Sequence, residues 1–385
     1  MKILIIRTFS GYIDLSNATY NYQELGLARA FNKKGHKCDV VYFGGKESKE
    51  VKISYEDNKE YSVYYIKGKE ILQNGIYSKE LYKLIENYDI VHAGGYDQLE
   101  SWILAKRIPQ KLVIYNGPYY SNFNKGYNKK CKVFDMFFLP RYKKNNIYFD
   151  TKSKLSATFL REKGLKNVTP IGVGIDLEQL QAQKMIESEV SKRIKEEKKN
   201  GNKIITYIGK LEPRRNTTFL IDLFKSITDK RKNIKLLIIG RGEEDYKKIC
   251  FDKIKEYGLE DKVIYVEKLQ QELLPKIYYS SDVFLLPTRY EIFGMVLLEA
   301  MYFGVPVITT YNGGSDMLIE DGKSGKIIDD FDIKKWEKTV EILLDNNDLR
   351  EKMIKYAKEK IEQEFTWDAL TDKFLEVFQN RLNNQ

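Results

Sequence analysis

Residues 289–310 read RYEIFGMVLLEAMYFGVPVITT and combine an apolar helical pattern, 295–303, with the short apolar run 305–309. Such a pattern is typical of a buried helix followed by a buried strand. The stretch nevertheless carries two acids, Glu291 and Glu299, eight residues apart on either side of Gly294. These carboxylates are either solvated side chains at the ends of a core helix or parts of a site.

Short apolar runs alternate with amphipathic patterns along the chain, which predicts parallel sheets covered by helices on both faces. The pattern stops near residue 164 and restarts near residue 204, so we expect two doubly wound, Rossmann-like domains. The expected strands are 2–6, 38–43, 90–93, 112–115 and 136–139, then 204–208, 236–239, 263–266, 283–286 and 305–309. The expected helices include 22–34, 217–230, 246–257, 295–303 and an amphipathic terminal helix in 365–378.

Length and composition agree with two globular domains. A chain of 385 residues exceeds the size at which single cores stop growing, about 250–300 residues. The three cysteines lie far apart without a CxxC pair, which argues against a disulfide framework or a zinc site and favours a reducing compartment. No segment approaches the roughly 18 apolar residues of a membrane span, and the first apolar run is too short for a signal peptide. We therefore expect a cytoplasmic protein.

The charge is unevenly distributed. Residues 1–175 hold 29 basic and 17 acidic side chains, whereas the remainder holds 36 and 38, within a net charge of +10. This asymmetry favours an anionic partner for the first half, either a phospholipid surface or a phosphate-bearing substrate. The alternative is a generally lysine-rich composition without a specific partner.

Three turns in the second half point to a nucleotide diphosphate. Gly209 and Lys210 end one expected strand, and Arg215 follows shortly after them. A second strand ends at Gly240, and Gly294 stands where the helix of 295–303 should begin. Glycines let the backbone approach a ligand, and unpaired N–H groups at a helix N-terminus form an anion site.

Other nucleotide and metal motifs are weaker. The Gly240-Arg241-Gly242 turn lacks the further spacing of a dinucleotide fingerprint, and no Walker A loop occurs. Asp330-Phe331-Asp332 has the form of a metal-binding DxD, but it precedes a helical pattern, so we interpret Asp332 as an N-cap.

The order of these features resembles the donor domain of family 4 glycosyltransferases, which have the GT-B fold: two Rossmann-like domains facing an inter-domain cleft. The resemblance extends over nearly the whole chain. One departure is that Lys210 and Arg215 exchange the usual arginine and lysine. The matching elements are Gly209-Lys210, Arg215, the Gly240 turn, the E-x7-E pair Glu291 and Glu299, and Asn312-Gly313-Gly314.

The resemblance implies an acceptor-binding domain in residues 1–170, a nucleotide-sugar domain in 171–364, and a terminal helix, 365–385, that packs back on the first domain. It also implies metal-independent catalysis without a cofactor. Lys210 and Arg215 would neutralise the leaving phosphate, Glu291 would contact the donor sugar, and Glu299 would bind the ribose hydroxyls. The implied donor-binding set is Gly11, Gly209, Lys210, Arg215, Gly240, Phe293, Gly294, Met295, Val296 and Glu299, and the catalytic set is Lys210, Arg215 and Glu291.

Acceptor contacts are expected in the first half. Gly11 lies in the loop after the first strand, where the family has glycines near donor phosphate and acceptor. Asn21, Gln23 and Glu24 open the next helix, at the expected edge of the cleft, and are candidates to contact the acceptor. Many relatives place a histidine at the position of Asn116, which can hydrogen-bond a sugar but cannot shuttle protons. His92 ends a strand and is either a cleft residue or a core histidine.

Residues 122–146 interleave seven basic side chains and one acid with several aromatics. This composition favours docking on an anionic membrane whose lipid carries the acceptor. The alternative is that 133–139 form an ordinary buried strand flanked by exposed lysines. Aromatic–basic interleaving also occurs in single-strand nucleic-acid binders, but no nucleic-acid motif accompanies it, so nucleic acid is not an expected partner.

Together these features predict a retaining glycosyltransferase that moves a hexose from a nucleotide-sugar, UDP-linked rather than GDP-linked, to a hydroxyl of a lipid-linked or cell-surface glycan. Such an enzyme would serve polysaccharide biosynthesis and could sit peripherally at the inner face of the cell membrane. Two alternatives remain: a non-catalytic GT-B partner subunit that binds a glycan or stabilises an enzyme, and a sugar-nucleotide epimerase of related fold.

Overall fold

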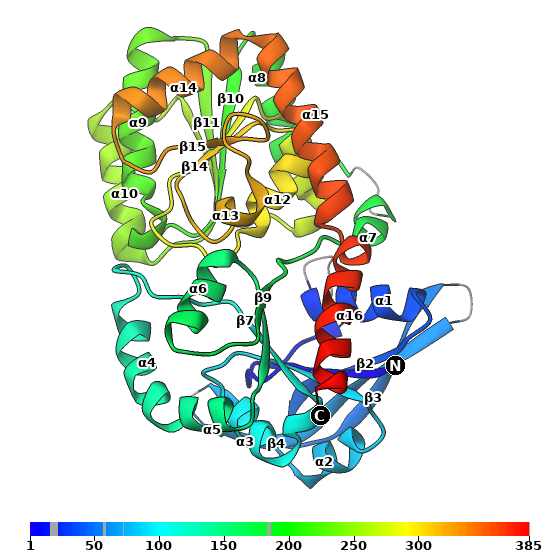
Figure 1. Cartoon of the computed structure of the whole chain (residues 1–385). Coiled ribbons are helices and arrows are strands. Elements are labelled where there is room, and N and C mark those ends of the chain that lie inside the picture. Colours follow the sequence, from blue (N-terminus) through cyan, green and yellow to red (C-terminus); the bar gives the residue numbers. More distant parts are fainter. Residues whose placement is uncertain (16–21, 57–58, 72, 183–185, 385) are drawn as a thin grey trace. The chain divides into compact units, whose positions relative to one another are not determined.

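A computed structural model of the chain describes residues 1–15, 22–56, 59–71, 73–182 and 186–384 (Figure 1). It divides into two compact units. The first comprises Met1–Asp176 and Phe365–Gln385, and the second comprises Leu177–Glu364. The chain thus crosses from the first unit to the second after Asp176 and returns for its last helix.

The first unit is built on a sheet with the strand order β3-β4-β2-β1-β6-β7-β8-β9. Its strands pair in parallel, except that β4 runs antiparallel to β3 and β5. The chain fills the sheet on the β2 side of β1 before it moves to β6 on the other side, and ligands of such sheets bind where this reversal occurs. The strands are β1 (Lys2–Ile6), β2 (Lys37–Gly45), β3 (Lys49–Glu56), β4 (Lys59–Ile71), β5 (Asn74–Tyr77), β6 (Ile90–Gly94), β7 (Leu112–Asn116), β8 (Tyr148–Thr151) and β9 (Val168–Pro170).

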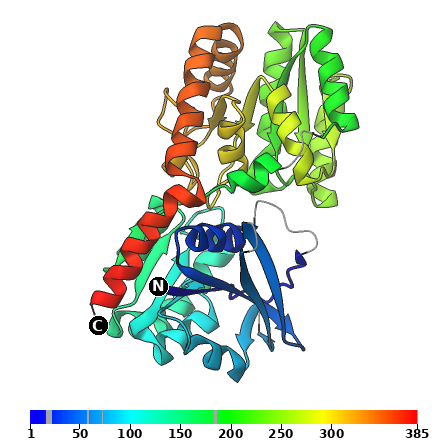
Figure 2. The ribbon, with the colours of Figure 1, turned by 90° about the vertical axis from the view of Figure 1, so that its right-hand side faces the viewer.

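Helices cover this sheet, and the last of them comes from the far end of the chain. Helix α16 (Trp367–Asn383) packs against α1 (Gln23–Lys33) and against strands β7 and β8 (Figures 1 and 2). The ring of Phe374 lies 6.3 Å from that of Phe31 and 5.5 Å from the His92 imidazole, between centroids. The other helices of the unit are α2 (Lys79–Ile85), α3 (Leu99–Arg107), α4 (Lys125–Phe137), α5 (Leu139–Lys144) and α6 (Lys154–Glu162).

The second unit has the strand order β12-β11-β10-β13-β14-β15, with every strand pair parallel. Helices lie on both faces of this sheet, as Figure 1 shows for α9 and α10 on one side and α8 and α15 on the other. Its strands are β10 (Lys203–Ile208), β11 (Ile234–Ile239), β12 (Val263–Val266), β13 (Val283–Leu286), β14 (Val307–Thr309) and β15 (Lys326–Ile327). Its helices are α7 (Leu177–Ala182), α8 (Glu189–Lys199), α9 (Thr217–Lys230), α10 (Glu244–Glu256), α11 (Leu274–Ser280), α12 (Met295–Tyr302), α13 (Ser315–Leu318), α14 (Ile333–Asp345) and α15 (Asn347–Glu364).

The two doubly wound sheets expected from the sequence are confirmed, but the strand expected at 136–139 is wrong. Those residues end α4 and begin α5. The apolar run was interpreted as a buried strand, because consecutive apolar residues are typical of one. In the structure, however, Met136 and Phe137 are 63% and 56% exposed. The N-cap interpretation of Asp332 is confirmed: its carboxylate accepts the N–H groups of Lys334 at 2.8 Å and Lys335 at 3.4 Å.

Within the described parts of the chain, no helix combines the length and the apolar character needed to cross a membrane.

We predict that Phe374→Ala destabilises the first unit. Removing a buried ring from the contact between α16 and the sheet should cost about 3–5 kcal/mol, visible as a lower Tm in circular dichroism. Glu376→Ala, on the exposed side of the same helix, is the matched control and should leave the Tm within about one degree, as surface changes usually do. Equal melting of both variants would show that α16 does not stabilise the unit.

Candidate donor site in the second unit

The chain leaves β10 and β11 through two glycines whose backbones touch. A Cβ atom on Gly240 would collide with the carbonyl group of Gly209, so the second position requires glycine. Just after these glycines, the Leu211 N–H donates to the Arg241 carbonyl over 2.7 Å. The main chain of Lys210 is therefore fixed between these contacts while its side chain remains exposed.

The short 3₁₀ turn Pro213–Arg215 is clamped to the loop after β13. The Arg289 N–H donates to the Arg214 carbonyl over 2.7 Å, and Arg214 Nη1 donates to the Tyr290 carbonyl over 3.0 Å. Thr288 Oγ1 donates to the Arg214 carbonyl over 3.2 Å. These bonds hold the two loops in one arrangement before any ligand binds.

The clamp brings two expected site residues together. Arg215 Nη1 donates to Glu291 Oε2 in an ion pair whose side chains are 14% and 11% exposed. The other carboxylate oxygen of Glu291 accepts the Ile292 N–H at 3.0 Å. Glu212 Oε1 pairs with Arg214 Nη2 over 2.7 Å and lies 3.7 Å from Arg215 Nε. A carboxylate this deeply buried requires such partners, since unpaired burial of a charge is costly.

Gly294 turns the chain into α12. Its φ of +75° lies in the left-handed region that favours glycine, and a Cβ there would stand 3.1 Å from Glu291 Cγ. The N–H groups of Met295 and Val296 have no acceptor within the helix, whereas the Leu297 N–H donates to the Gly294 carbonyl over 2.9 Å. Met295 and Val296 are both partly exposed. The positive end of α12 therefore opens beside the Arg215–Glu291 pair and suits an anion.

A second glycine turn supports this loop from behind. The Asn312 side chain, itself 1% exposed, accepts the N–H groups of Gly314 at 2.9 Å and Ser315 at 3.1 Å. The Gly313 N–H donates to the Glu291 carbonyl over 3.0 Å. A Cβ on Gly314 would collide with the Phe293 carbonyl, and the Phe293 side chain is buried. Close backbone packing thus sets the course of the chain through Glu291 and Phe293.

Glu299 lies within α12 and is only 1% exposed. Its Oε2 accepts the hydroxyl of Tyr278, from α11, at 2.7 Å. The Tyr278 ring stacks on Phe303 with centroids 5.5 Å apart, so the donor is fixed in turn. The carboxylate is therefore oriented rather than solvated, and Tyr278 is a site-supporting residue that sequence reasoning missed.

In the first unit, His92 is a core residue. Its Nε2 lies 3.0 and 3.1 Å from the two oxygens of Asp150, whose pKa is raised mainly by burial and held down by His92. Three rings surround the imidazole with centroids 5.4–5.5 Å away: Tyr115, and Phe374 and Phe378 of α16. This position favours the core alternative for His92.

Asn116 is also engaged by the fold. Its amide nitrogen donates to the Pro118 carbonyl over 3.0 Å and to Ser156 Oγ over 2.9 Å, and its oxygen accepts the Tyr96 N–H at 3.3 Å. The side chain is fully buried. Both N–H groups are used within the fold, so Asn116 shapes the turn after β7.

The remaining two candidates from the sequence are Gly11 and Asn21. Gly11 is exposed in the loop after β1, and a Cβ there would meet nothing within 4 Å. The fold therefore does not require glycine at that position. Asn21 lies outside the described residues.

A polar cluster lies instead at the carboxyl ends of β1 and β8 and at the start of α1. It contains Gln23 and Glu24, which the sequence had indicated as acceptor contacts, together with Arg7 and Lys152, which sequence reasoning missed. Arg7 pairs with Glu24 over 3.1 Å, with side chains 31% and 21% exposed. Lys152 Nζ donates to Gln23 Oε1 over 2.8 Å, and burial lowers the pKa of its ammonium while Glu24 raises it. These residues are up to 145 positions apart in the chain, so no sequence pattern joins them.

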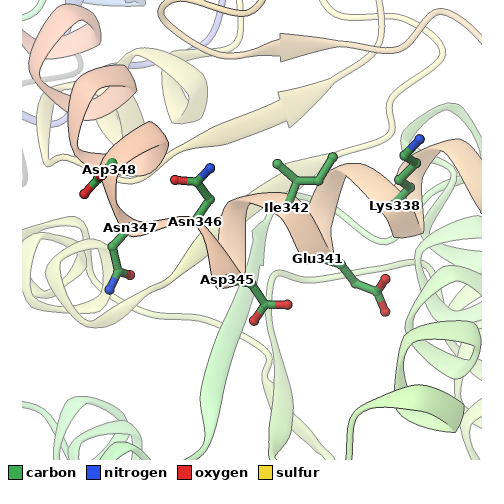
Figure 3. A pocket seen from close by; sticks show the side chains of 7 residues that line it. All are labelled: Lys338, Glu341, Ile342, Asp345, Asn346, Asn347 and Asp348. Atoms are coloured by element: carbon green, nitrogen blue, oxygen red, sulfur yellow. The ribbon is translucent and has the colours of Figure 1, made fainter.

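The second unit also has a shallow hollow that is separate from the candidate donor residues. Figure 3 shows that it lies where α14 meets α15, and that carboxylate and amide side chains dominate it. Its lining consists of Lys338, Glu341, Ile342, Asp345, Asn346, Asn347 and Asp348, and includes none of the candidate donor residues. Among the residues that the structure describes, no cluster of His, Cys, Asp and Glu side chains is arranged to hold a metal ion.

Comparison with known proteins identifies the class of the second unit. Residues 189–360 match the family described as "Glycosyl transferases group 1". The second unit is therefore similar to group 1 glycosyltransferase domains, and the whole chain has the GT-B fold expected from the sequence. The crystal structure of Anabaena Alr3699/HepE in complex with UDP-glucose is similar over 99% of this chain and 100% of that one, with a TM-score of 0.72 and 16% sequence identity.

Two curated relatives are similar over shorter regions. Spore coat protein SA of Bacillus subtilis is 27% identical over 187 residues, which are 47% of this chain and 49% of the relative. Mannosylfructose-phosphate synthase of Agrobacterium fabrum is 29% identical over 185 residues, covering 46% and 41% of the two chains. The chain thus matches about half the length of these curated relatives.

We predict that Gly314→Ala displaces the loop of Glu291 and Phe293, because the new methyl group collides with backbone that cannot rotate away. The expected result is a lower Tm together with weaker UDP binding by calorimetry. Gly126→Ala is the matched control: a Cβ there meets nothing within 4 Å. Wild-type UDP affinity in the Gly314 variant would show that the turn does not set the loop.

Proposed function

We propose that the protein is a retaining glycosyltransferase that moves a hexose from a UDP-sugar to a hydroxyl of a lipid-linked or cell-surface glycan. The observation that carries this proposal is the Arg215–Glu291 ion pair beside Gly294, at the open N-terminus of α12. An anion-binding helix end, a guanidinium and a carboxylate meet there, as a charged donor with a sugar hydroxyl would require. The group 1 family match of this domain supports the same function.

The donor diphosphate binds in this proposal against the N–H groups of Met295 and Val296. The exposed Lys210 ammonium and the Arg215 guanidinium supply the positive charge that a metal ion would otherwise provide. Because Arg215 already pairs with Glu291, its geometry is preset, and the arriving phosphate needs only the free side of the guanidinium. The UDP-glucose complex of the Anabaena protein supports UDP as the nucleotide.

The two glutamates bind different parts of the donor, the hexose and the ribose. Glu291 lies before the helix, beside Gly294, and accepts hydroxyl groups of the hexose. Glu299 lies one turn deeper, oriented by Tyr278, and accepts the ribose hydroxyls, for which a carboxylate is well suited.

The reaction is a front-face displacement. The bond between the anomeric carbon and the phosphate oxygen breaks as the bond to the acceptor oxygen forms on the same face, so the configuration is retained. The acceptor proton moves to the departing phosphate oxygen, whose negative charge Lys210 and Arg215 stabilise. This route needs no side-chain base, which agrees with the burial of His92 and with the presence of asparagine, whose amide cannot take up the proton, at position 116.

The acceptor side of the reaction belongs in this proposal to the cluster of Arg7, Gln23, Glu24 and Lys152. These side chains are partly exposed at the carboxyl ends of parallel strands, the edge at which such sheets bind ligands. Their mixed charge suits a hydroxyl-rich molecule, which needs both donors and acceptors.

A second candidate is a partner subunit that binds a nucleotide or glycan without transferring it. The asparagine at position 116, where many relatives carry a histidine close to the reacting sugar, and the single glycine in the loop after β1 favour this alternative.

The first test is a thermal-shift and product assay of the full chain. UDP should raise the Tm more than GDP does, since a ligand that binds only the folded state stabilises it. Mass spectrometry of products from a panel of UDP-sugars and glycan acceptors should then detect transfer. A shift with UDP but no product from any pair would favour the partner subunit, and no shift with either nucleotide would refute donor binding.

We predict that Glu299→Gln weakens UDP binding roughly tenfold or more, because hydrogen bonds to a charged group contribute about 1.5–3 kcal/mol. Glutamine keeps the shape of the side chain, so a loss of affinity reports the charge rather than a cavity. Glu362→Ala, exposed on α15, is the control and should bind UDP as the wild type does. Unchanged affinity of the Glu299 variant in calorimetry would exclude the ribose assignment.

A further inference from the structure

Helix α4 presents large apolar side chains to solvent. Val133, Met136 and Phe137 are 54%, 63% and 56% exposed, and Phe123, just before the helix, is 50% exposed. Soluble surfaces carry single apolar residues routinely, but a contiguous apolar patch marks an interaction site. This patch requires an explanation that the transfer reaction does not supply.

The helical repeat gathers these side chains into one stripe. With about 3.6 residues per turn, positions 133, 136 and 137 fall on the same side of α4. Lys125 and Lys132 lie along one edge of that stripe, Lys130 along the other, and Lys129 within it, and all four are exposed. We call this surface, comprising Val133, Met136, Phe137 and the four lysines, the α4 face.

The opposite side of the helix is anchored in the first unit. Cys131 is fully buried, and Asp135 pairs with the Lys163 ammonium. The Lys163 ammonium in turn lies 4.5 Å from the ring centroids of both Tyr120 and Phe159. The α4 face is therefore the outer side of a firmly held helix, and it does not result from a poorly packed segment.

The charges of the α4 face select its partner. Asp135 is the only acid within residues 122–146, and it is occupied by Lys163. Two copies of this chain meeting through the α4 face would bring lysines against lysines. A surface of lipid phosphates, by contrast, pairs with the lysines, while acyl chains accept the apolar stripe between them.

We propose that α4 is an interfacial helix that docks the first unit on an anionic phospholipid membrane. Val133, Met136 and Phe137 enter the boundary between headgroups and acyl chains, and the lysines extend their ammonium groups to the phosphates. This inference stands apart from the proposed transfer reaction, because the α4 face shares no residue with the candidate donor site. It gives the chain a route to an acceptor carried by a lipid.

The test is vesicle sedimentation of the full chain with mixed phosphatidylglycerol–phosphatidylcholine vesicles and with phosphatidylcholine alone. The wild type should bind the mixed vesicles, more weakly at high salt, and should bind phosphatidylcholine at least tenfold more weakly. Val133→Ser/Met136→Ser should reduce binding to the mixed vesicles at least tenfold. Ile249→Ser/Ile342→Ser is the matched control, since those side chains are 53% and 43% exposed in the other unit, and it should bind as the wild type does.

A charge variant separates the two parts of the interaction. Lys129→Glu/Lys130→Glu should also lose binding at least tenfold, whereas Lys248→Glu/Lys255→Glu, on exposed positions of α10, should not. A UDP-induced Tm shift equal to that of the wild type in all variants would show that the donor site and the fold are intact.

Three outcomes would overturn the proposal. One is vesicle binding that survives the Val133/Met136 change, and another is equal binding to vesicles with and without phosphatidylglycerol. The third is a dimer in light scattering that the same double change dissociates while vesicle binding is absent, which would make the α4 face an interface between two copies.

Discussion

The contact on which the donor site depends is one between two stretches of backbone. Gly314 lies against the Phe293 carbonyl so closely that no side chain fits between them, and Gly313 donates its N–H to the Glu291 carbonyl. Asn312, buried beneath, holds the glycine turn in place. Backbone contacts of this kind allow little adjustment. The loop that carries Glu291 and leads into α12 is therefore held in a single conformation. The positions of the carboxylate, of Gly294 and of the open helix end all follow from it.

A second constraint is electrostatic. The ion pair with Glu291 holds the Arg215 guanidinium in a fixed position at the edge of this loop, and the turn that contains Arg215 is bonded to the backbone of Arg289 and Tyr290. Because these groups are already ordered, the protein loses less conformational entropy when a ligand binds. In the proposed reaction, preorganised positive charge is what the departing phosphate needs. The helix terminus, the ammonium of Lys210 and the guanidinium of Arg215 would supply it.

The sequence offered candidate residues for this site, but it did not show which residues hold them in place. Gly294, Glu291 and Arg215 were expected because glycine turns, acids and bases stand out against apolar runs, and the alternation of strands and helices predicted both sheets. Tyr278 was missed because it acts on Glu299, which lies 21 positions further along the chain. In the first unit, Asp150 was missed because it acts on His92, 58 positions away. His92 and Asn116 looked accessible because a strand end faces a ligand in general, but the sequence cannot show that α16 covers His92. The expected strand at 136–139 failed for the opposite reason, since its apolar residues are exposed.

The most direct test of the central claim is a crystal structure of the full chain with UDP bound. The account predicts the diphosphate at the N–H groups of Met295 and Val296, Arg215 in contact with a phosphate oxygen, and the ribose hydroxyls within hydrogen-bond distance of Glu299. A nucleotide bound elsewhere, or one whose ribose lies away from Glu299 while its phosphates avoid α12, would contradict it.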